Sequence, residues 1–201
     1  LNFIEADKIP VDFGATVVTC MDINAHKKLK KYFNINDDRD SIIDYTMGTV
    51  EPCEELMQKF GSDVRRVGLN VIAPEIKENK YEGGFGIRYR KAEPHEYFDV
   101  YYSPLNFAGV PDKQDLDCLK MPDPDNPELY YGLEDRTKDL FDNSSYAVFA
   151  DFGVPGFYET SQKIRGYENL ACDLLLNRDF LFDLYDRLLE LQTRFFNNYL
   201  N

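Results

Sequence analysis

The sequence predicts an α/β fold with a parallel sheet and a separate antiparallel hairpin. Three segments of strand length occur at 11–13, 64–69 and 146–150, and helical patterns separate the first two. A strand, a helix and a second strand at this spacing are typical of a βαβ unit, whose strands pair in parallel. We therefore expect one parallel sheet with its strands in sequence order. Residues 81–102 break this rhythm by alternating apolar and polar positions around the letters KAEPHE, which predicts a hairpin at 85–102 outside the main sheet.

Two helices are expected in the first third of the chain. Asp22 is a suitable N-cap for the first, because its carboxylate can accept hydrogen bonds from the first free backbone amides. The second begins near Pro52, a residue favoured in the first helical turn, and Gly61 ends it. The apolar faces are expected to be Ile23, His26, Leu29 and Phe33 in the first helix, and Leu56, Met57 and Phe60 in the second.

Three more helices are expected after the hairpin. A proline-rich loop leads into a helix at about 127–141, and two further helices follow the third strand at roughly 157–175 and 178–200. Asn177 is a suitable cap for the last helix. The apolar stripe of this helix consists of Phe180, Leu184, Leu188, Leu191 and Phe195.

The composition is that of an acidic globular protein. The chain has 201 residues, of which 43% are hydrophobic, and a net charge of −13. Its tight group of basic residues is Lys27, Lys28, Lys30 and Lys31. This group falls on the polar side of the first predicted helix, whereas binding to nucleic acid needs a basic face. A membrane span needs about 20 consecutive apolar residues, a run that the sequence lacks. We therefore expect neither nucleic acid nor a membrane as a partner.

The cysteines predict neither a zinc site nor a clear disulfide framework. They are Cys20, Cys53, Cys118 and Cys172. Their separations lack the short paired spacing of zinc ligands. Pairing in an oxidising compartment stays open as an alternative. Without a signal-peptide pattern, the cysteines favour reduced, mostly buried thiols in a cytoplasmic protein.

Three stretches of the chain together resemble uroporphyrinogen decarboxylase-like proteins. DKIPVDFGAT resembles the entry to their first strand, and EPCEELMQKFGSDVRRVGLN resembles the following helix and the second strand. The segment from MPDPDNPELYYGLEDRTKDLF to LFDLYDRLLE resembles the part that contains their third strand, including an Arg-Gly-aromatic-Glu pattern at Arg165 to Glu168. The order and spacing of these stretches extend the resemblance over nearly the whole chain.

The resemblance implies a (β/α)8 TIM barrel, of which this chain would supply about three of the eight βα units. We therefore interpret 1–201 as one partial barrel domain, truncated at both ends. This interpretation agrees with a first residue, Leu1, that is not methionine and with a last residue, Asn201, inside a helical pattern. Three strands leave an open sheet edge. We expect the missing part of the barrel, a second chain or a homo-oligomer to cover this edge.

The same resemblance implies where the active site lies. In such barrels it forms at the carboxyl ends of the strands. In this chain these ends are Asp12 to Thr16, Asn70 and Asp151 to Tyr158. The catalytic candidates among them are Asn70 and Asp12. The substrate-binding candidates are Tyr158, Ser161, Arg165 and Glu168.

Several of these residues also have a structural interpretation. Asp12 could simply bind neighbouring backbone, and Arg165 could pair with Glu168 on a helix surface, because the two lie three residues apart. Arg65 and Arg66 alternate along the second strand and should point to opposite faces. One is expected to face a partner such as Asp12 in a buried ion pair.

The resemblance allows more than one activity. The family contains decarboxylases of haem synthesis, and methyltransferases that use a corrinoid protein and a thiol such as coenzyme M. The decarboxylases bind a polycarboxylate through an Arg-Gln-Ala-Gly-Arg motif after the first strand, whereas the loop here, FGATVV, has no cation. They also use an aspartate after the second strand, where this chain has Asn70, and a tyrosine near the position of Ser161. These three departures favour methyl transfer.

The favoured hypothesis is therefore an enzyme that transfers methyl groups to or from a small substrate or a corrinoid protein, active at full length rather than as this fragment. Uroporphyrinogen decarboxylation in porphyrin biosynthesis stays open as an alternative. So does a non-catalytic barrel that binds a tetrapyrrole or a protein partner. The zinc ligands of the methyltransferase branch would lie beyond Asn201, so no cofactor is expected within this chain. His26 on an apolar helix face and His95 at the hairpin tip are not expected to replace them.

Overall fold

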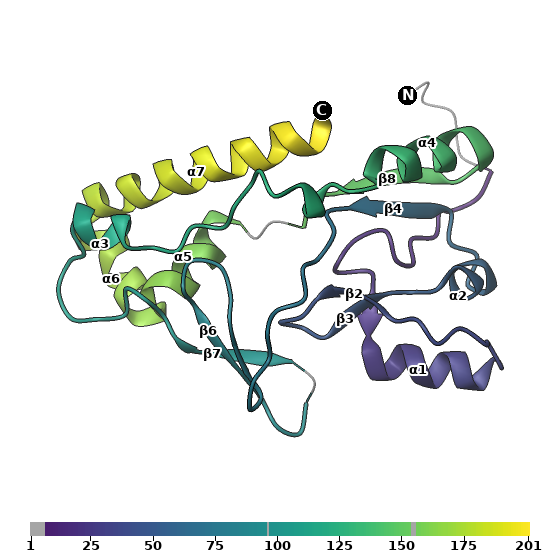
Figure 1. Cartoon of the computed structure of the whole chain (residues 1–201), viewed down its shortest axis with the longest axis horizontal. Coiled ribbons are helices and arrows are strands. Elements are labelled where there is room, and N and C mark those ends of the chain that lie inside the picture. The colour runs from purple at the N-terminus through teal and green to yellow at the C-terminus, as the bar shows by residue number, and fades with distance from the viewer. Residues whose placement is uncertain (1–6, 96, 154–155) are drawn as a thin grey trace. The chain divides into compact units, whose positions relative to one another are not determined.

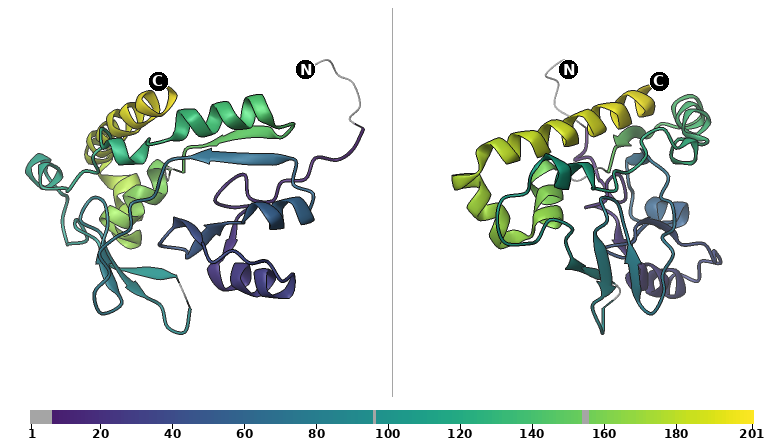
Figure 2. Two further views of the ribbon diagram at one scale, coloured as in Figure 1. Left: turned by 45° about the vertical axis from the view of Figure 1, so that its right-hand side comes forward. Right: turned by 60° about the vertical axis from the view of Figure 1, so that its left-hand side comes forward.

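The computed structural model describes residues 7–95, 97–153 and 156–201 (Figures 1 and 2). The chain separates into two compact units. The first unit is made of Leu1–Val71 and Tyr131–Gly153, and the second of Ile72–Tyr130 and Val154–Asn201. The structure is mixed α/β, and the strands of the described residues do not close into a barrel. No helix in the described part of the chain is both long and apolar enough to cross a membrane.

A two-stranded parallel sheet is the main feature of the first unit. It pairs β4 (Val64–Gly68) with β8 (Ala147–Asp151), in register over the whole length of both strands (Figure 1). The helix α4 (Leu133–Asn143) precedes β8 and contacts both strands. The predicted parallel pairing of the second and third strands is therefore confirmed.

The predicted first strand, at 11–13, is wrong as a strand. These residues do run beside the start of β4, where the carbonyl of Val11 accepts a hydrogen bond from the amide of Asp63 at 2.8 Å. Side chains take the place of the remaining ladder bonds. The amide of Val11 donates to the Asp63 carboxylate at 2.9 Å, and the amide of Phe13 donates to the Ser62 hydroxyl at 3.2 Å.

A small antiparallel sheet, which the patterns did not predict, completes the strands of the first unit. It consists, in spatial order, of β1 (Met21–Asp22), β3 (Thr49–Glu51) and β2 (Ser41–Asp44). Strands of two to four residues are too short for alternation to be visible in the sequence. Their pairing depends on residues that are distant along the chain.

The first helix begins where the sequence predicts. Asp22 caps α1 (Ile23–Tyr32), and its carboxylate accepts hydrogen bonds from the amides of Asn24 and Ala25. The second helix, α2 (Glu54–Lys59), is shorter than expected. Because α2 ends at Lys59, Phe60 turns outward and is 43% exposed, so its predicted burial is wrong.

The helix predicted at 127–141 begins later in the structure. Gly132 adopts a left-handed conformation with φ of 75° and separates a single 3₁₀ turn, η1 (Pro127–Leu129), from α4. Glycine tolerates positive φ because it lacks a Cβ atom.

The second unit contains a three-stranded antiparallel sheet. Its strands, in spatial order, are β5 (Lys80–Glu82), β6 (Arg88–Lys91) and β7 (Phe98–Tyr102). The hairpin predicted at 85–102 is confirmed as β6 and β7, and β5 adds a third strand. Tyr81 and Tyr89 stack on the inner face of this sheet, with ring centroids 4.8 Å apart.

Helices cover the inner face of this sheet and form the core of the second unit. They are α3 (Lys113–Asp117), α5 (Phe157–Arg165), α6 (Tyr167–Leu176) and α7 (Arg178–Leu200). The single helix predicted at 157–175 is two helices, because Gly166 breaks it with φ of 82°. Asn177 occupies the N-cap position of α7, but its side chain donates to Asp173 instead of capping the helix. The predicted stripe of α7 is buried throughout.

Candidate functional site

A cluster of four charged side chains lies at the carboxyl end of the β4–β8 pair. Arg66 on β4 donates from Nε to Asp151 Oδ2 on β8 at 2.8 Å, and its Nη1 lies 3.8 Å from Glu51 Oε2 on β3. Arg136 on α4 donates to Glu51 Oε1 at 2.5 Å. We call these four residues the charged cluster. The side chains of Arg66 and Glu51 are 5% and 9% exposed, so the electrostatic attraction between opposite charges is only weakly screened by water.

Arg65 and Arg66 point to opposite faces of β4, as expected from their alternation, and the expected ion pair of one of them is the buried pair of Arg66 with Asp151. Arg65 is also buried, but its partner Glu54 is 50% exposed. Arg65 points to the other face of β4, where its Nη2 and Nε bind the two oxygens of Glu54 at 2.7 and 2.8 Å. Arg66 binds Asp151. The expected partner, Asp12, binds neither arginine in the structure. Arg65 is therefore a link between β4 and α2, and Arg66 is a link between the two strands.

Gly68 provides the space that Arg66 needs. A Cβ atom at Gly68 would lie 2.1 Å from Arg66 Nη2, which is closer than any real contact. Residues two apart in a strand share a face, so the guanidinium extends over Gly68 toward the end of β4. Any larger residue at this position would displace Arg66 from Asp151.

The loop after residues 11–13 folds onto the charged cluster. Asp151 Oδ2 also accepts a hydrogen bond from the amide of Val17 at 3.1 Å. Asp12 Oδ1 accepts from the amide of Ala15 at 3.0 Å, so this carboxylate closes a local turn, which is the structural role considered for it. Burial, together with the charge of Glu51, raises the pKa of the Cys20 thiol to about 12. Cys20 is therefore a neutral thiol and not a nucleophile at neutral pH.

Asn70 lies just beyond the carboxyl end of β4 and is exposed. Its Nδ2 donates to the backbone carbonyl of Tyr131 at 2.9 Å and so holds the chain that leads into α4. Asp12 and Asn70 thus belong to the same unit as the charged cluster. Their catalytic role stays a prediction.

Arg165 is held on all sides by protein groups in the second unit. Its Nε donates to Asp173 Oδ2 at 2.6 Å, and its Nη1 donates to the carbonyls of Leu105 and Phe107 at 2.6 and 2.8 Å. Its Nη2 donates to the carbonyl of Gly109 at 2.6 Å. The side chains of Arg165 and Asp173 are 2% and 1% exposed. Arg165 therefore fastens the loop that contains these carbonyls to α5 and α6.

The other three substrate-binding candidates differ in accessibility. Tyr158 on α5 is 51% exposed, and Glu168 on α6 is also exposed. Ser161 is fully buried, and its hydroxyl has no hydrogen-bond partner in the described part of the chain. Arg165 pairs with Asp173 rather than with Glu168, so the expected surface pair is wrong. Of the four candidates, only Tyr158 and Glu168 are open to a ligand.

His26 belongs to a buried polar network, as its place on the apolar side of α1 suggested. Its Nδ1 lies 2.8 Å from Asp40 Oδ1, and its Nε2 accepts a hydrogen bond from the amide of Cys53 at 3.1 Å. The proton of the neutral ring is therefore on Nδ1. Lys30 also binds Asp40, at 2.9 Å. His95 is exposed between β6 and β7 and stacks on Tyr97.

Stability is expected to fall as the pH is lowered from about 7 toward 5, because burial holds the pKa of His26 below its ordinary value of 6.5. In this window the unfolded chain binds a proton that the folded His26 excludes. The stabilisation is complete above the unfolded pKa and is lost as the pH falls through the folded one. Urea unfolding at a series of pH values gives the free energy of unfolding as a function of pH. His26→Gln should make this free energy less dependent on pH between 7 and 5, whereas His95→Gln should leave the dependence unchanged. An equal dependence in the two variants would contradict the assignment to His26.

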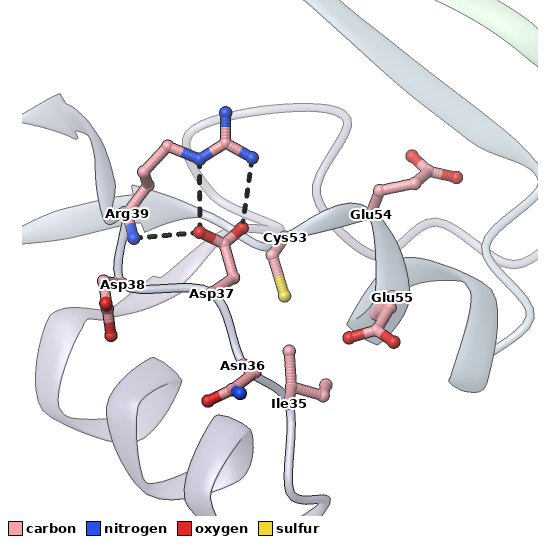
Figure 3. Close-up of a pocket in the computed structure, with 8 residues that line it drawn as sticks. All are labelled: Ile35, Asn36, Asp37, Asp38, Arg39, Cys53, Glu54 and Glu55. Atoms are coloured by element: carbon pink, nitrogen blue, oxygen red, sulfur yellow. Dashed lines mark hydrogen bonds and ion pairs between the residues drawn. The ribbon is translucent and has the colours of Figure 1, made fainter.

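A hollow of about 510 Å³ opens in the first unit (Figure 3). It is lined by Ile35, Asn36, Asp37, Asp38, Arg39, Cys53, Glu54 and Glu55. Arg39 binds the Asp37 carboxylate at 3.2 Å, and Arg65 binds Glu54, so two of the four carboxylates are already neutralised. No three His, Cys, Asp or Glu side chains of the described residues are arranged to hold a metal ion.

The burial of the cysteines and two residues of the charged cluster were not predicted correctly from the sequence. The cysteines are free, but Cys20 and Cys53 are only half-buried and Cys118 and Cys172 are exposed, so the expected burial is wrong. The sequence placed Asp151 at the carboxyl end of the third strand, where the active site was expected, but it did not single out the charged-cluster residues Glu51 and Arg136. Residues 154 and 155, which belong to the same expected end, lie outside the described residues. The one available signal was the placement of charged residues at the ends of apolar strands.

Comparisons of this chain with protein-family models, with curated proteins and with solved structures find no match.

Proposed function

We propose that this chain forms part of a uroporphyrinogen decarboxylase-like (β/α)8 barrel, and that the protein transfers methyl groups with a corrinoid protein or a small thiol as its substrate. The observation that carries the proposal is the parallel β4–β8 pair with the charged cluster and Asn70 at its carboxyl end. Barrels of this type hold their active sites at that end of the strands.

The surface of β8 supports a larger sheet. The strand consists of Ala147, Val148, Phe149, Ala150 and Asp151, yet Phe149 is 47% exposed and both alanines are exposed. Parallel sheets are normally covered on both faces, and a two-stranded sheet alone is marginal in water. Further barrel strands beside β8, with their helices, would bury these side chains.

The 201-residue chain alone is expected to self-associate, because the free edge of β8 and its apolar faces are open. Sedimentation over a range of concentrations measures this. Phe149→Lys should shift the equilibrium toward monomer, and Phe141→Lys on α4, where the ring is 79% exposed, should have a smaller effect. A sharp monomer that unfolds cooperatively would contradict the argument.

The charges at the carboxyl end of the sheet favour methyl transfer over decarboxylation of uroporphyrinogen. A substrate with many carboxylates needs uncompensated cations. The two arginines at this end, Arg66 and Arg136, are already bound by Asp151 and Glu51. The loop at 14–18 adds no cation.

The whole protein is expected to lack uroporphyrinogen decarboxylase activity. An amide at Asn70 carries no charge to stabilise a protonated pyrrole, a loss comparable with the roughly 3–4 kcal/mol of one oxyanion-hole donor. The assay is anaerobic incubation with uroporphyrinogen and separation of the products by their number of carboxylates. Asn70→Asp should not restore turnover, because the arginines stay neutralised. Turnover to the four-carboxylate product at ordinary enzyme rates would refute the methyl-transfer proposal.

In the methyltransferase branch, a bound zinc ion would convert the substrate thiol into its more nucleophilic thiolate. The described residues provide no set of three ligands for it, and Cys20 is held as a neutral thiol. We therefore assign no zinc-dependent step to this chain. In the proposal, Asp12 fixes the shape of the loop beside the substrate, and the side-chain amide of Asn70 forms a hydrogen bond with the substrate.

The direct test of methyl transfer incubates the whole protein with methylcobalamin and coenzyme M and follows demethylation by its visible spectrum. Asn70→Ala should lower the rate, whereas Lys77→Ala, an exposed change in the other unit, should not. Binding of a tetrapyrrole without either activity would instead support the non-catalytic alternative.

A further inference from the structure

The outer face of α7 carries an apolar stripe. Phe182, Leu189 and Leu200 are 64%, 52% and 68% exposed. They are separated by seven and eleven residues, intervals that return to the same side of an α-helix. This side is opposite the buried stripe of α7, so the helix has apolar residues on two faces.

An acidic row runs along one side of this stripe. It consists of Asp179, Asp183, Asp186 and Glu190, all exposed. None of the four forms an ion pair within the described residues. The two arginines further around the helix do not compensate them, because Arg187 binds Asp117 and Arg194 binds Asp125. Arg178, the first residue of α7, is an exposed cation next to Asp179 in the sequence. From Asp183 to Glu190 the surface beside the stripe is therefore negative.

We propose that this surface of α7 docks a basic amphipathic helix of a protein partner. Apolar residues of that helix, three to four positions apart, would cover Phe182 and Leu189. Lysine or arginine residues beside them would pair with the acidic row, which gives the interface its specificity. The inference does not depend on the proposed enzymatic activity.

Charge argues against the other possible occupants. A second copy of this chain, packed antiparallel on α7 about a two-fold axis, would place its own acidic row against this one. An anionic membrane surface would be repelled by the same four carboxylates. A basic helix is the occupant that both the stripe and the row favour.

The test uses two synthetic 18-residue helical peptides with the same leucine face, one carrying lysines and the other glutamates. Their binding to the whole chain is measured by fluorescence anisotropy. The lysine peptide should bind about tenfold or more tightly than the glutamate peptide, since several exposed charge pairs each contribute modestly. The difference should shrink as salt is added.

Substitutions on α7 locate the binding site. Phe182→Ala with Leu189→Ala should weaken binding of the lysine peptide about tenfold. Asp186→Lys with Glu190→Lys should reverse the preference between the peptides. The matched control is Phe141→Ala with Asp142→Lys on α4, which changes the same residue types on another exposed helix and should leave binding unchanged. Circular dichroism checks that each variant is folded.

Three results would overturn the proposal. The peptides could bind equally well, or the control variant could lose binding as much as the α7 variants do. In the third case, sedimentation would reveal a dimer that Leu189→Asp abolishes, which would assign the stripe to a second copy of the chain. Failure of methyl transfer in the enzymatic assay would leave these outcomes unaffected.

Discussion

Replacement of Arg165 by methionine is expected to lower the free energy of unfolding by about 3–5 kcal/mol. Methionine keeps much of the apolar stem but removes every donor of the guanidinium. Asp173, which is 1% exposed, would then be a buried charge without its cation. The carbonyls of Leu105, Phe107 and Gly109 would lose their donor as well. A loss of this size is a large fraction of the 5–15 kcal/mol that stabilises a typical domain.

Urea unfolding followed by circular dichroism measures the change. Arg178→Met is the matched control, because Arg178 is exposed at the start of α7, where a substitution should change stability by no more than about 0.5 kcal/mol. A stable Arg165→Met variant that had lost only ligand binding would restore Arg165 to the substrate site.

The elements that the sequence predicted correctly are those whose signal is local and long. The stripe of α7 runs from Phe180 to Phe195, β8 is an apolar run that ends at Asp151, and β4 lies between Asp63 and Leu69. The hairpin of β6 and β7 shows alternation on both strands. In each case the pattern on one segment is enough, since the period of the apolar residues follows directly from the geometry of the element.

The elements that were wrong depend on contacts between distant segments. Residues 11–13 resemble a strand, but the Asp63 carboxylate and the Ser62 hydroxyl take the hydrogen bonds that a ladder would need. Gly166 divides a helix whose apolar pattern is continuous, because nothing in that pattern reports a positive φ.

The sequence predicted where the candidate site lies better than it predicted which residues form it. A parallel sheet brings the carboxyl ends of its strands together, so Asn70 and Asp151 fall at one end of the β4–β8 pair. Burial is harder to infer from the sequence. Arg165 resembles a substrate contact by residue type, yet its donors are all used by backbone and by Asp173. The partner of Arg66 lies 85 residues away in the sequence. Both Asp12 and Asp151 carry a negative charge, so the sequence alone does not show which of them pairs with Arg66.

Asp151→Ala is expected to destabilise the first unit by about 3 kcal/mol or more, because it leaves the 5%-exposed Arg66 without its nearest anion. The amide of Val17 would lose its acceptor too, so the loop at 12–20 should become mobile. Asp151→Asn keeps an oxygen that can accept both hydrogen bonds and removes only the charge. Its cost should be smaller, about 1–2 kcal/mol.

Urea unfolding measures these differences, and hydrogen exchange at Val17 reports on the loop. Lys8→Met tests the alternative that any broken ion pair in this unit is costly. Lys8 is 63% exposed in its pair with Asp63, so this variant should lose far less stability than Asp151→Ala. Arg66→Met with Asp151→Ala should lose less than the sum of the single changes, since the double variant has no buried charge left unpaired. Additive losses would contradict a direct link between Arg66 and Asp151.

Hydrogen exchange at Val17 tests the link between Asp151 and the loop that carries Asp12. Exchange should be faster in Asp151→Ala but not in Asp151→Asn, and this result would show that Asp151 holds the loop in place.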